Sequence, residues 1–287
     1  MGRALTVAVE EVRRADQRRR FHELGRVLFA SEPRWAPPVV AYERWLFDRR
    51  HPYRRDADLT RFLVRRRGQV VGRVCAHKRS DSDDGWFGAF ECGDDERAVV
   101  ALVGAARDWL AEHGATSITG PATFTPADEA GVLLAGFEHP GGTGRPWHPP
   151  WYEAHLGTAG LKSGEHTVRR WRLDANPVGY ELEAGGPLPP QAGRFADARI
   201  VLAGPPGAIA AVPDVAPSLR THSLRGFRQQ LATVEEVAVV RCEGDPTVLV
   251  PALLRAAAEA GYRTVWAPWS PVDRPPDLEY RLLTAPF

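Results

Sequence analysis

One stretch of the chain, residues 60–119, constrains the fold more than any other, because its hydrophobic period changes from two to about 3.6 and back. Two alternating runs flank a tight turn at Arg67-Gly68 and predict a β-hairpin. A polar loop, the apolar run WFGAFEC and a long amphipathic segment follow. The predicted elements are strands at 60–66, 69–77 and 85–92, a helix at 96–113 and a strand at 116–119.

These five elements predict a defined topology. The first three strands are expected to be consecutive antiparallel neighbours. The helix is expected to begin at an N-cap supplied by Asp94 or Asp95 and to end at Gly114. It then crosses to a parallel fourth strand, and such a crossover is right-handed.

The flanking sequence predicts further short elements. Thr6–Val12 alternates like a strand, and residues 15–30 have apolar residues at helical spacing. A short helix is expected at 42–47, after the proline-rich SEPRWAPPVV. Residues 150–160 begin with Pro and end with Gly, which is typical of a short helix, and residues 165–174 alternate as a strand.

Length and composition predict a globular protein of two domains. The chain has 287 residues, of which 44% are hydrophobic and 25% charged. Residues 174–196 are rich in Gly and Pro and are the predicted linker. We therefore expect a first domain at 1–173 and a smaller α/β domain at 197–287.

The C-terminal part of the sequence repeats a pattern that is found in the N-terminal part. Residues 237–268 give the order strand, Gly-Asp cap, helix, Gly, strand, Pro, which is also the order of residues 87–121. Gly114 and Pro121 match Gly261 and Pro268 at one offset. Either any strand–helix–strand unit has this appearance, or the second domain is a degenerate copy of half of the first.

Charge and cysteine content exclude several classes of function. The net charge of +1 provides no overall field for nucleic acid or an anionic membrane. Three cysteines without a CxxC pair predict neither a disulfide framework nor a zinc site. The N-terminus lacks the apolar core of a signal peptide, and no apolar run approaches the length of a membrane span. A cytoplasmic location is therefore expected, and the oligomeric state stays open.

Several separate pieces, in order over residues 31–161, resemble a bacterial family of uncharacterised GNAT-like proteins. The pieces are Pro33-Arg34-Trp35-Ala36-Pro37-Pro38, Val71-Gly72-Arg73, Gly120-Pro121 with Ala127-Asp128-Glu129-Ala130-Gly131, and Pro149-Pro150-Trp151-Tyr152. The resemblance implies that residues 1–173 form an α/β (α+β) GNAT-like domain, with a mixed central sheet flanked by helices. It implies acyl transfer from acetyl-CoA or another acyl-CoA to an amine.

The expected acyl-CoA site departs from what the chemistry requires. In the GNAT superfamily the diphosphate of CoA lies where the central strand turns into the long helix, on backbone N–H groups at the positive end of the helix dipole. Here Cys92, Gly93 and Arg97 are the candidate cofactor-binding residues. Asp94, Asp95 and Glu96 lie among them and would repel a diphosphate. Acyl-CoA binding is therefore expected to be weak or absent.

Four residues are candidates for catalysis. Glu91, at the end of the central strand, lies where GNAT enzymes often keep a base, or is an exposed strand-end carboxylate. Asp128 and Glu129 follow a strand and could accept a proton from an amine, unless they belong to a helix cap. Tyr152 is a candidate acid or a packed aromatic, because Leu156 stands where many GNAT enzymes have the acidic Tyr.

Aromatic and histidine side chains near these residues could bind an amine substrate. The candidates are Trp35, His139, Trp147, His148 and Trp151, and the tryptophans have core or loop-anchoring roles as the alternative. The spacing of the histidines and Glu138 matches no strong metal motif, so no metal is expected. Two functions remain: N-acyl transfer to a small amine, or a GNAT-derived unit that has lost acyl-CoA binding and serves as a binding module or runs other chemistry.

Overall fold

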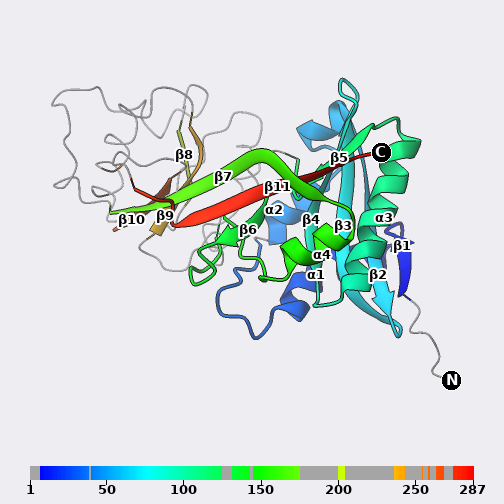
Figure 1. Cartoon of the computed structure of the whole chain (residues 1–287), viewed down its shortest axis with the longest axis horizontal. Coiled ribbons are helices and arrows are strands. Elements are labelled where there is room, and N and C mark those ends of the chain that lie inside the picture. The colour runs from blue at the N-terminus through cyan, green and yellow to red at the C-terminus, as the bar shows by residue number, and fades with distance from the viewer. Residues whose placement is uncertain are drawn as a thin grey trace.

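The computed structural model describes residues 7–38, 40–124, 131–142, 145–174, 200–203, 236–242, 254, 258, 263–267 and 274–287. For residues 40–42, 200–203 and 236–242 it describes the backbone. One mixed sheet of 11 strands runs through this part of the chain, in the order β1-β2-β3-β4-β5-β11-β7-β10-β9-β8, with β6 paired to β11 (Figure 1).

The predicted hairpin and third strand are confirmed. β2 (Ala57–Arg66) and β3 (Gln69–Arg79) are antiparallel, and the turn between them takes Arg67 and Gly68 into left-handed backbone, with φ of 51° and 81°. β4 (Asp84–Cys92) pairs antiparallel with β3. β1 (Val7–Glu11) pairs antiparallel with β2 at the other edge.

The predicted helix and parallel strand are also confirmed. α3 (Glu96–Glu112) begins at the N-cap Asp95, and β5 (Ser117–Gly120) is parallel to β4. Their pairing covers only the first residues of β4, up to Trp86 opposite Thr119. The segment after β5 then lies against the middle of β4, where the Ala122 N–H donates to the Phe87 carbonyl over 2.7 Å. Among the described strands, none pairs with the end of β4 on that side.

Helices cover both faces of the sheet. α1 (Ala15–Leu28) and α2 (Val40–Leu46), with the 3₁₀ turn η1 (Pro52–Arg55), lie on one face, and α3 lies on the other (Figure 1). Alternation along β2 and β3 explains this division. Leu63 and Cys75 pack with Phe21 of α1, whereas Phe62 and Val74 pack with the apolar side of α3. α4 (Tyr152–Thr158) packs beside α3.

Two long strands join the two halves of the chain. β7 (Lys162–Asp174) and β11 (Leu278–Pro286) run antiparallel across the molecule (Figure 1). β11 also pairs with β5 and with β6 (Val132–Ala135). The last strand of the chain therefore lies in the same sheet as the first domain, although the sequence prediction groups it with residues 197–287. The linker predicted at 174–196 lies outside the described residues, apart from Asp174, which ends β7.

The predicted C-terminal strands are confirmed at β9 (Glu236–Cys242) and β10 (Thr264–Ala267), and their arrangement repeats that of β4 and β5. β9 and β10 are parallel and pair over three residues, as β4 and β5 do. β8 (Ile200–Ala203) pairs antiparallel with β9, as β3 does with β4. The helix that the sequence pattern predicts between β9 and β10 lies largely outside the described residues, of which Leu254 and Ala258 are helical.

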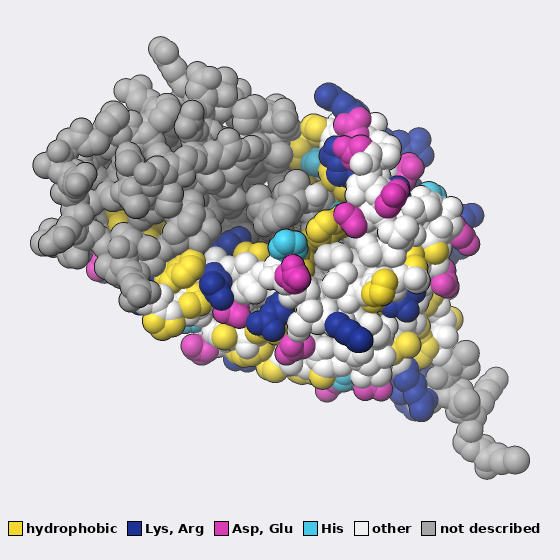
Figure 2. Space-filling model, turned by 45° about the horizontal axis from the view of Figure 1, so that its top comes forward, with side chains coloured by type: hydrophobic (Ala, Val, Ile, Leu, Met, Phe, Trp, Pro, Cys, Tyr) yellow, Lys and Arg dark blue, Asp and Glu magenta, His cyan; other side chains and the backbone are white. Residues whose placement is uncertain are grey.

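The described surface mixes both signs of charge. Acidic and basic side chains are interspersed over the face shown in Figure 2. Within the described ranges, no helix combines the length and the apolar character that crossing a membrane requires.

Candidate functional site at the end of β4

The candidate site lies where β4 ends and α3 begins, at residues 91–96, the β4–α3 corner. Three elements converge on it: β4 from the sheet, α1 from one face and α4 from the other. The corner contains Glu91, Cys92 and Gly93, three of the residues predicted to act in catalysis or cofactor binding.

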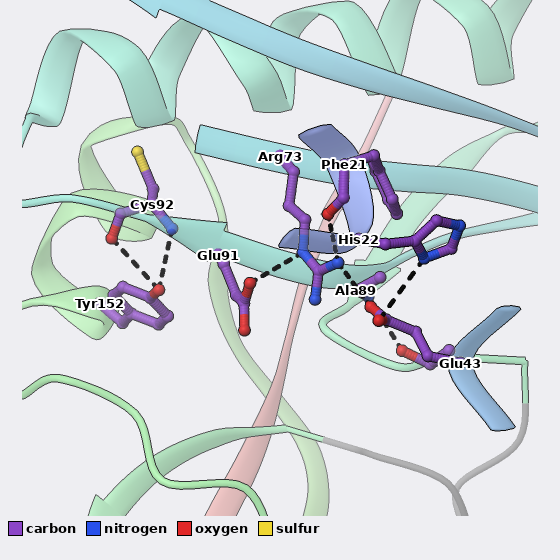
Figure 3. A network of polar contacts seen from close by, with 9 residues as sticks. Phe21, His22, Glu43, Arg73, Ala89, Glu91, Cys92 and Tyr152 are labelled. Carbon is purple, nitrogen blue, oxygen red and sulfur yellow. Dashed lines mark hydrogen bonds and ion pairs between the residues drawn. The ribbon is translucent and has the colours of Figure 1, made fainter. Parts of the chain in front are cut away.

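Tyr152 occupies the edge of β4 that β5 leaves without a partner. The Cys92 N–H donates to the Tyr152 hydroxyl over 2.9 Å, and the hydroxyl donates to the Cys92 carbonyl over 3.2 Å (Figure 3). The Tyr152 side chain is fully buried, and burial raises its pKa well above the ordinary value, with the Glu91 carboxylate acting in the same direction. Both backbone groups of Cys92 are therefore satisfied by the protein itself.

The start of α3 is also occupied by groups of the chain. The Asp95 carboxylate accepts from the Ala98 N–H over 3.3 Å and pairs with Arg66. Asp94 pairs with His155 of α4 over 2.8 Å, and Glu96 accepts from the Thr158 hydroxyl over 3.3 Å. An anion at this helix end would meet three carboxylates.

The candidate cofactor residues have roles within the fold. The Gly93 N–H donates to the Val71 carbonyl over 2.9 Å, so this N–H is already bonded. The Cys92 thiol is buried, which raises its pKa to about 12. Arg97 is exposed on the first turn of α3. At the β4–α3 corner, the N–H groups of Cys92 and Gly93 are therefore bonded within the protein, and residues 94–96 bring three carboxylates to the start of α3.

Replacing Asp95 with Ala tests how firmly the start of α3 is held by this carboxylate. The loss of the N-cap should destabilise the protein by about 0.5–2 kcal/mol. The matched control is Asp94→Ala, which removes a pair at the surface of the same loop and should cost under about 1 kcal/mol. Urea denaturation monitored by circular dichroism measures both. Equal costs for the two variants would contradict the capping role.

Glu91 lies in a buried network of charges on the other side of β4. Its carboxylate is 2.9 Å from Arg73 Nε, and Arg73 Nη1 donates to Glu43 of α2 over 2.5 Å and to the Phe21 carbonyl over 2.6 Å (Figure 3). His22 Nδ1 lies 3.5 Å from the second oxygen of Glu43. Arg73 thus ties α1 and α2 to β3 and β4.

The two carboxylates of this network differ in their pKa values. Burial raises the pKa of Glu91, and the Arg73 guanidinium opposes this only in part. Burial also raises the pKa of Glu43, but the charges and hydrogen bonds of Arg73 and His22 outweigh it and hold that pKa below the ordinary value. A β-carbon on Gly25 of α1 would lie 2.4 Å from the Glu91 carboxylate oxygens, so α1 closes directly over that group. Glu91 is therefore not an exposed carboxylate at the end of a strand, which was one of the two interpretations of the sequence.

The structure brings most of the aromatic candidates together. Trp35 packs on Phe29 at 5.7 Å between ring centroids, and Trp147 meets Phe29 edge-on at 6.3 Å. His148 stacks on Tyr152 at 5.4 Å, and its Nδ1 accepts from the Leu133 N–H over 3.2 Å. Burial lowers the pKa of His148 to about 4, so this histidine is neutral at physiological pH.

Other candidates lie apart or outside the described residues. His139 packs against Trp266 of β10 at 5.6 Å, and Trp151 is half-buried at the start of α4. Asp128 and Glu129 lie outside the described residues. Among the residues that are described, no group of three His, Cys, Asp or Glu side chains is arranged to hold a metal ion.

Sequence analysis missed Arg73, Glu43 and His155 as members of the site. One signal for Arg73 was available. Arg73, Cys75 and His77 alternate with Val74 and Ala76, which face α3, so β3 places a charged residue on the opposite, largely apolar face. No comparable signal marks Glu43 or His155, because both act across elements far apart in the sequence.

Known proteins resemble this chain in sequence over part of its length, although no family model matches it. Protein YghO of Escherichia coli is 31% identical over 150 residues, which are 50% of this chain and 38% of that protein. A bacterial ceramide synthase of Caulobacter vibrioides is 32% identical over 143 residues, 47% of this chain and 37% of that protein. The matched region thus spans well under half of each relative.

Solved structures resemble the whole chain. A tandem GNAT protein from the clavulanic acid biosynthesis pathway superposes with a TM-score of 0.56 over 98% of both chains, at 16% identity. A glucosamine N-acetyltransferase region of a fungal β-N-acetylglucosaminidase superposes with a TM-score of 0.52, at 13% identity, over 99% of this chain and 38% of that one. At these identities the likeness concerns the fold, and the protein has the fold of the GNAT superfamily, as the sequence resemblance predicted.

Proposed function

We propose that residues 7–174, completed by β11, form a GNAT-derived binding unit that does not hold acyl-CoA in the way usual for the superfamily. The closed β4–α3 corner supports this proposal. The Tyr152 hydroxyl bonds the backbone of Cys92, and the Asp95 carboxylate caps α3. Asp94 pairs with a histidine of α4. A GNAT unit that bound CoA there would need these same backbone groups and the same helix end.

Electrostatics favours the same conclusion. A like charge about 5–6 Å from a phosphate, at an effective dielectric of about 20, costs on the order of 3 kcal/mol before screening. Solvent reduces this several-fold, yet about 1.4 kcal/mol per charge still weakens binding tenfold. Two carboxylates at the corner, those of Asp94 and Glu96, are on exposed residues and would face an incoming diphosphate.

Calorimetric titration with acetyl-CoA tests the proposal. We expect no binding tighter than about 100 μM by the natural protein, because the corner is filled and negatively charged. The double variant Asp94→Gly/Asp95→Arg should also fail to bind, since Tyr152 remains on Cys92. Micromolar binding by the natural protein would contradict the proposal. Binding gained only in the double variant would mean that charge alone closes the site.

A second candidate function, N-acyl transfer to an amine, is favoured by the relative named bacterial ceramide synthase. Glu91 and Tyr152 interact electrostatically at the same corner. A carboxyl with a raised pKa can accept a proton near neutral pH, and a buried phenol can donate one. Amide formation from an activated acyl donor and an amine, measured by mass spectrometry and lowered in Glu91→Gln and Tyr152→Phe, would support this alternative.

We also propose that the chain is a tandem GNAT protein built by duplication. The equivalent registers of β4–β5 and β9–β10, each three pairs long, support it. The antiparallel partners of the two parallel pairs support it as well: β11 beside β5 and β7 beside β10. The division at 1–173 and 197–287 then describes two sequence units that exchange their last strands.

A further inference from the structure

A buried group of four titratable side chains, the Arg73 network, consists of Arg73, Glu43, Glu91 and His22. Arg73 Nη1 donates to Glu43 over 2.5 Å, and Arg73 Nε lies 2.9 Å from the Glu91 carboxylate (Figure 3). None of the four side chains is more than 12% exposed. A guanidinium stays protonated, whereas a carboxyl can take up a proton. Two ionised carboxyl groups beside one guanidinium would therefore leave a net negative charge inside the protein.

The two carboxyl groups of the Arg73 network have unequal partners. Glu43 bonds to Arg73, and its other oxygen lies 3.5 Å from His22 Nδ1. Arg61 of β2 is half-buried, and Glu43 is the network carboxylate that acts on it. Within the described ranges, the cation that pairs with Glu91 is Arg73, which Glu43 shares. Burial raises the pKa of Glu91, and the charge of Glu43 raises it further against the opposition of Arg73. Charge balance thus favours an ionised Glu43 and a protonated Glu91.

The other groups that face Glu91 are neutral. From α4 comes Tyr152, whose buried hydroxyl is bonded to the Cys92 backbone and stays a phenol. The Trp35 indole, from the segment after α1, forms a hydrogen bond with the Glu91 side chain. From α1 comes the backbone at Gly25, where a β-carbon would lie 2.4 Å from both Glu91 oxygens. None of these three groups brings a charge that could offset an ionised Glu91.

We propose that the Arg73 network holds one proton near neutral pH, carried by Glu91, and that this proton stabilises the packing of α1 over the end of β4. With Glu91 neutral, the charges of Arg73 and Glu43 cancel, and α1 can close on the carboxyl at Gly25. Ionisation would bury a net negative charge beneath α1, which is costly. The attachment of α1 to the sheet should therefore weaken as the pH rises.

This pH-dependent device goes beyond the proposed function, because it holds whether or not the β4–α3 corner binds acyl-CoA. If the chain does catalyse N-acyl transfer, Glu91 would have to lose this proton before it could act as a base.

Carbon-13 NMR of the side-chain carboxyl groups in the full chain shows which glutamate carries the proton. The resonances of Glu43 and Glu91, assigned through their backbone atoms, are followed as the pH is raised. At about pH 7 we expect Glu91 at the position of a protonated carboxyl and Glu43 at that of a carboxylate. An ionised Glu91 or a protonated Glu43 at this pH would overturn the proposal.

The variant Glu43→Gln tests the coupling between the two carboxyl groups. Arg73 then has Glu91 as its one carboxylate partner in the network, so the titration midpoint of Glu91 should fall by at least about one pH unit. Glu10→Gln is the matched control, because Glu10 pairs with Arg65 over 2.7 Å nearer the surface, and it should leave the midpoint unchanged. The same midpoint in Glu43→Gln as in the natural protein would contradict the shared charge balance.

Unfolding measured against pH separates the proton from a merely structural role of Glu91. A group whose pKa is raised on folding contributes stability below its unfolded pKa and loses it as the pH rises towards the folded value. Relative to Glu91→Gln, which cannot titrate, the folding equilibrium constant of the natural protein should fall about tenfold per pH unit between about pH 5 and pH 7. A ratio that does not change with pH would overturn the proposal.

Amide exchange of residues 21–28 tests the role of α1. After correction for its intrinsic dependence on pH, this exchange should accelerate over the same pH range in the natural protein and not in Glu91→Gln. Equal acceleration in both proteins would mean that the proton does not act on α1. If Glu91→Gln does not fold, the NMR titration of the natural protein decides.

Discussion

Replacing Arg73 with Met is expected to destabilise the protein by about 3–5 kcal/mol, the usual cost of breaking a buried ion pair by removing one partner. Arg73 is 4% exposed and holds Glu43 of α2 and Glu91 of β4. Without it, two carboxylates remain in an apolar surrounding. α1 and α2 also lose the link that Arg73 makes to the Phe21 carbonyl.

The stability that Arg73→Met loses should depend on pH, because the pKa values of Glu43 and Glu91 differ between the folded and unfolded chain. Without Arg73, the main charge that opposes burial is gone, and we expect both carboxyl groups to have pKa values above those of the unfolded chain. Such groups contribute stability below their unfolded pKa and lose it as the pH rises through the folded value. The deficit of Arg73→Met should therefore be smaller near about pH 5 than near about pH 8.

Urea denaturation of three variants measures the effect. The triple variant Glu43→Gln/Arg73→Met/Glu91→Gln removes the stranded charges and should recover much of the loss. Arg65→Met is the control, since Arg65 pairs with Glu10 nearer the surface and should cost under about 1 kcal/mol. A loss for Arg73→Met no larger than for the control would contradict the role assigned to the network.

Replacing Tyr152 with Phe is the second large prediction, with an expected cost of about 1–3 kcal/mol. The ring stays in place against Phe90 and His148, at 5.0 and 5.4 Å. The change removes only the hydroxyl, and with it the partner of both the Cys92 N–H and the Cys92 carbonyl. Two buried backbone groups are then unsatisfied, which carries the full desolvation cost.

Tyr280→Phe provides the matched control. Its ring is equally buried, and its hydroxyl donates to the Pro146 carbonyl over 3.0 Å. We expect a smaller loss, because a backbone carbonyl that loses one donor is tolerated better than a buried backbone N–H that loses its acceptor. Denaturation gives the free energies, and amide exchange of Cys92 should accelerate only in Tyr152→Phe. Unchanged exchange at Cys92 would mean that another group satisfies this strand edge.

Much of the fold could be predicted from the sequence because local pattern determines it. The alternation in β2 and β3, the turn at Arg67-Gly68 and the Asp95 cap of α3 are contained within short segments. The position of β11 could not be predicted in this way. Its partners β5 and β7 lie more than 100 residues earlier, and only the register of the completed sheet selects them.

Some members of the candidate site were predictable from the sequence, but its chemistry was not. Glu91, Cys92 and Tyr152 were identified, and the structure places them at one corner. Their state depends on distant residues, since Arg73 fixes Glu91 and α4 brings both Tyr152 and His155 to the corner. Repulsion by the carboxylates of residues 94–96 was expected from the sequence. The occupation of the Cys92 backbone by Tyr152 was not.

Hydrogen–deuterium exchange of the peptide covering residues 91–99, with and without saturating acetyl-CoA, is the most direct test of the closed β4–α3 corner. It reports on this corner even if acetyl-CoA binds elsewhere on the chain. The account predicts the same exchange in both samples, because the Cys92, Gly93 and Ala98 N–H groups are already bonded within the protein. Protection of this peptide by micromolar acetyl-CoA would contradict the account and would place the cofactor at the start of α3.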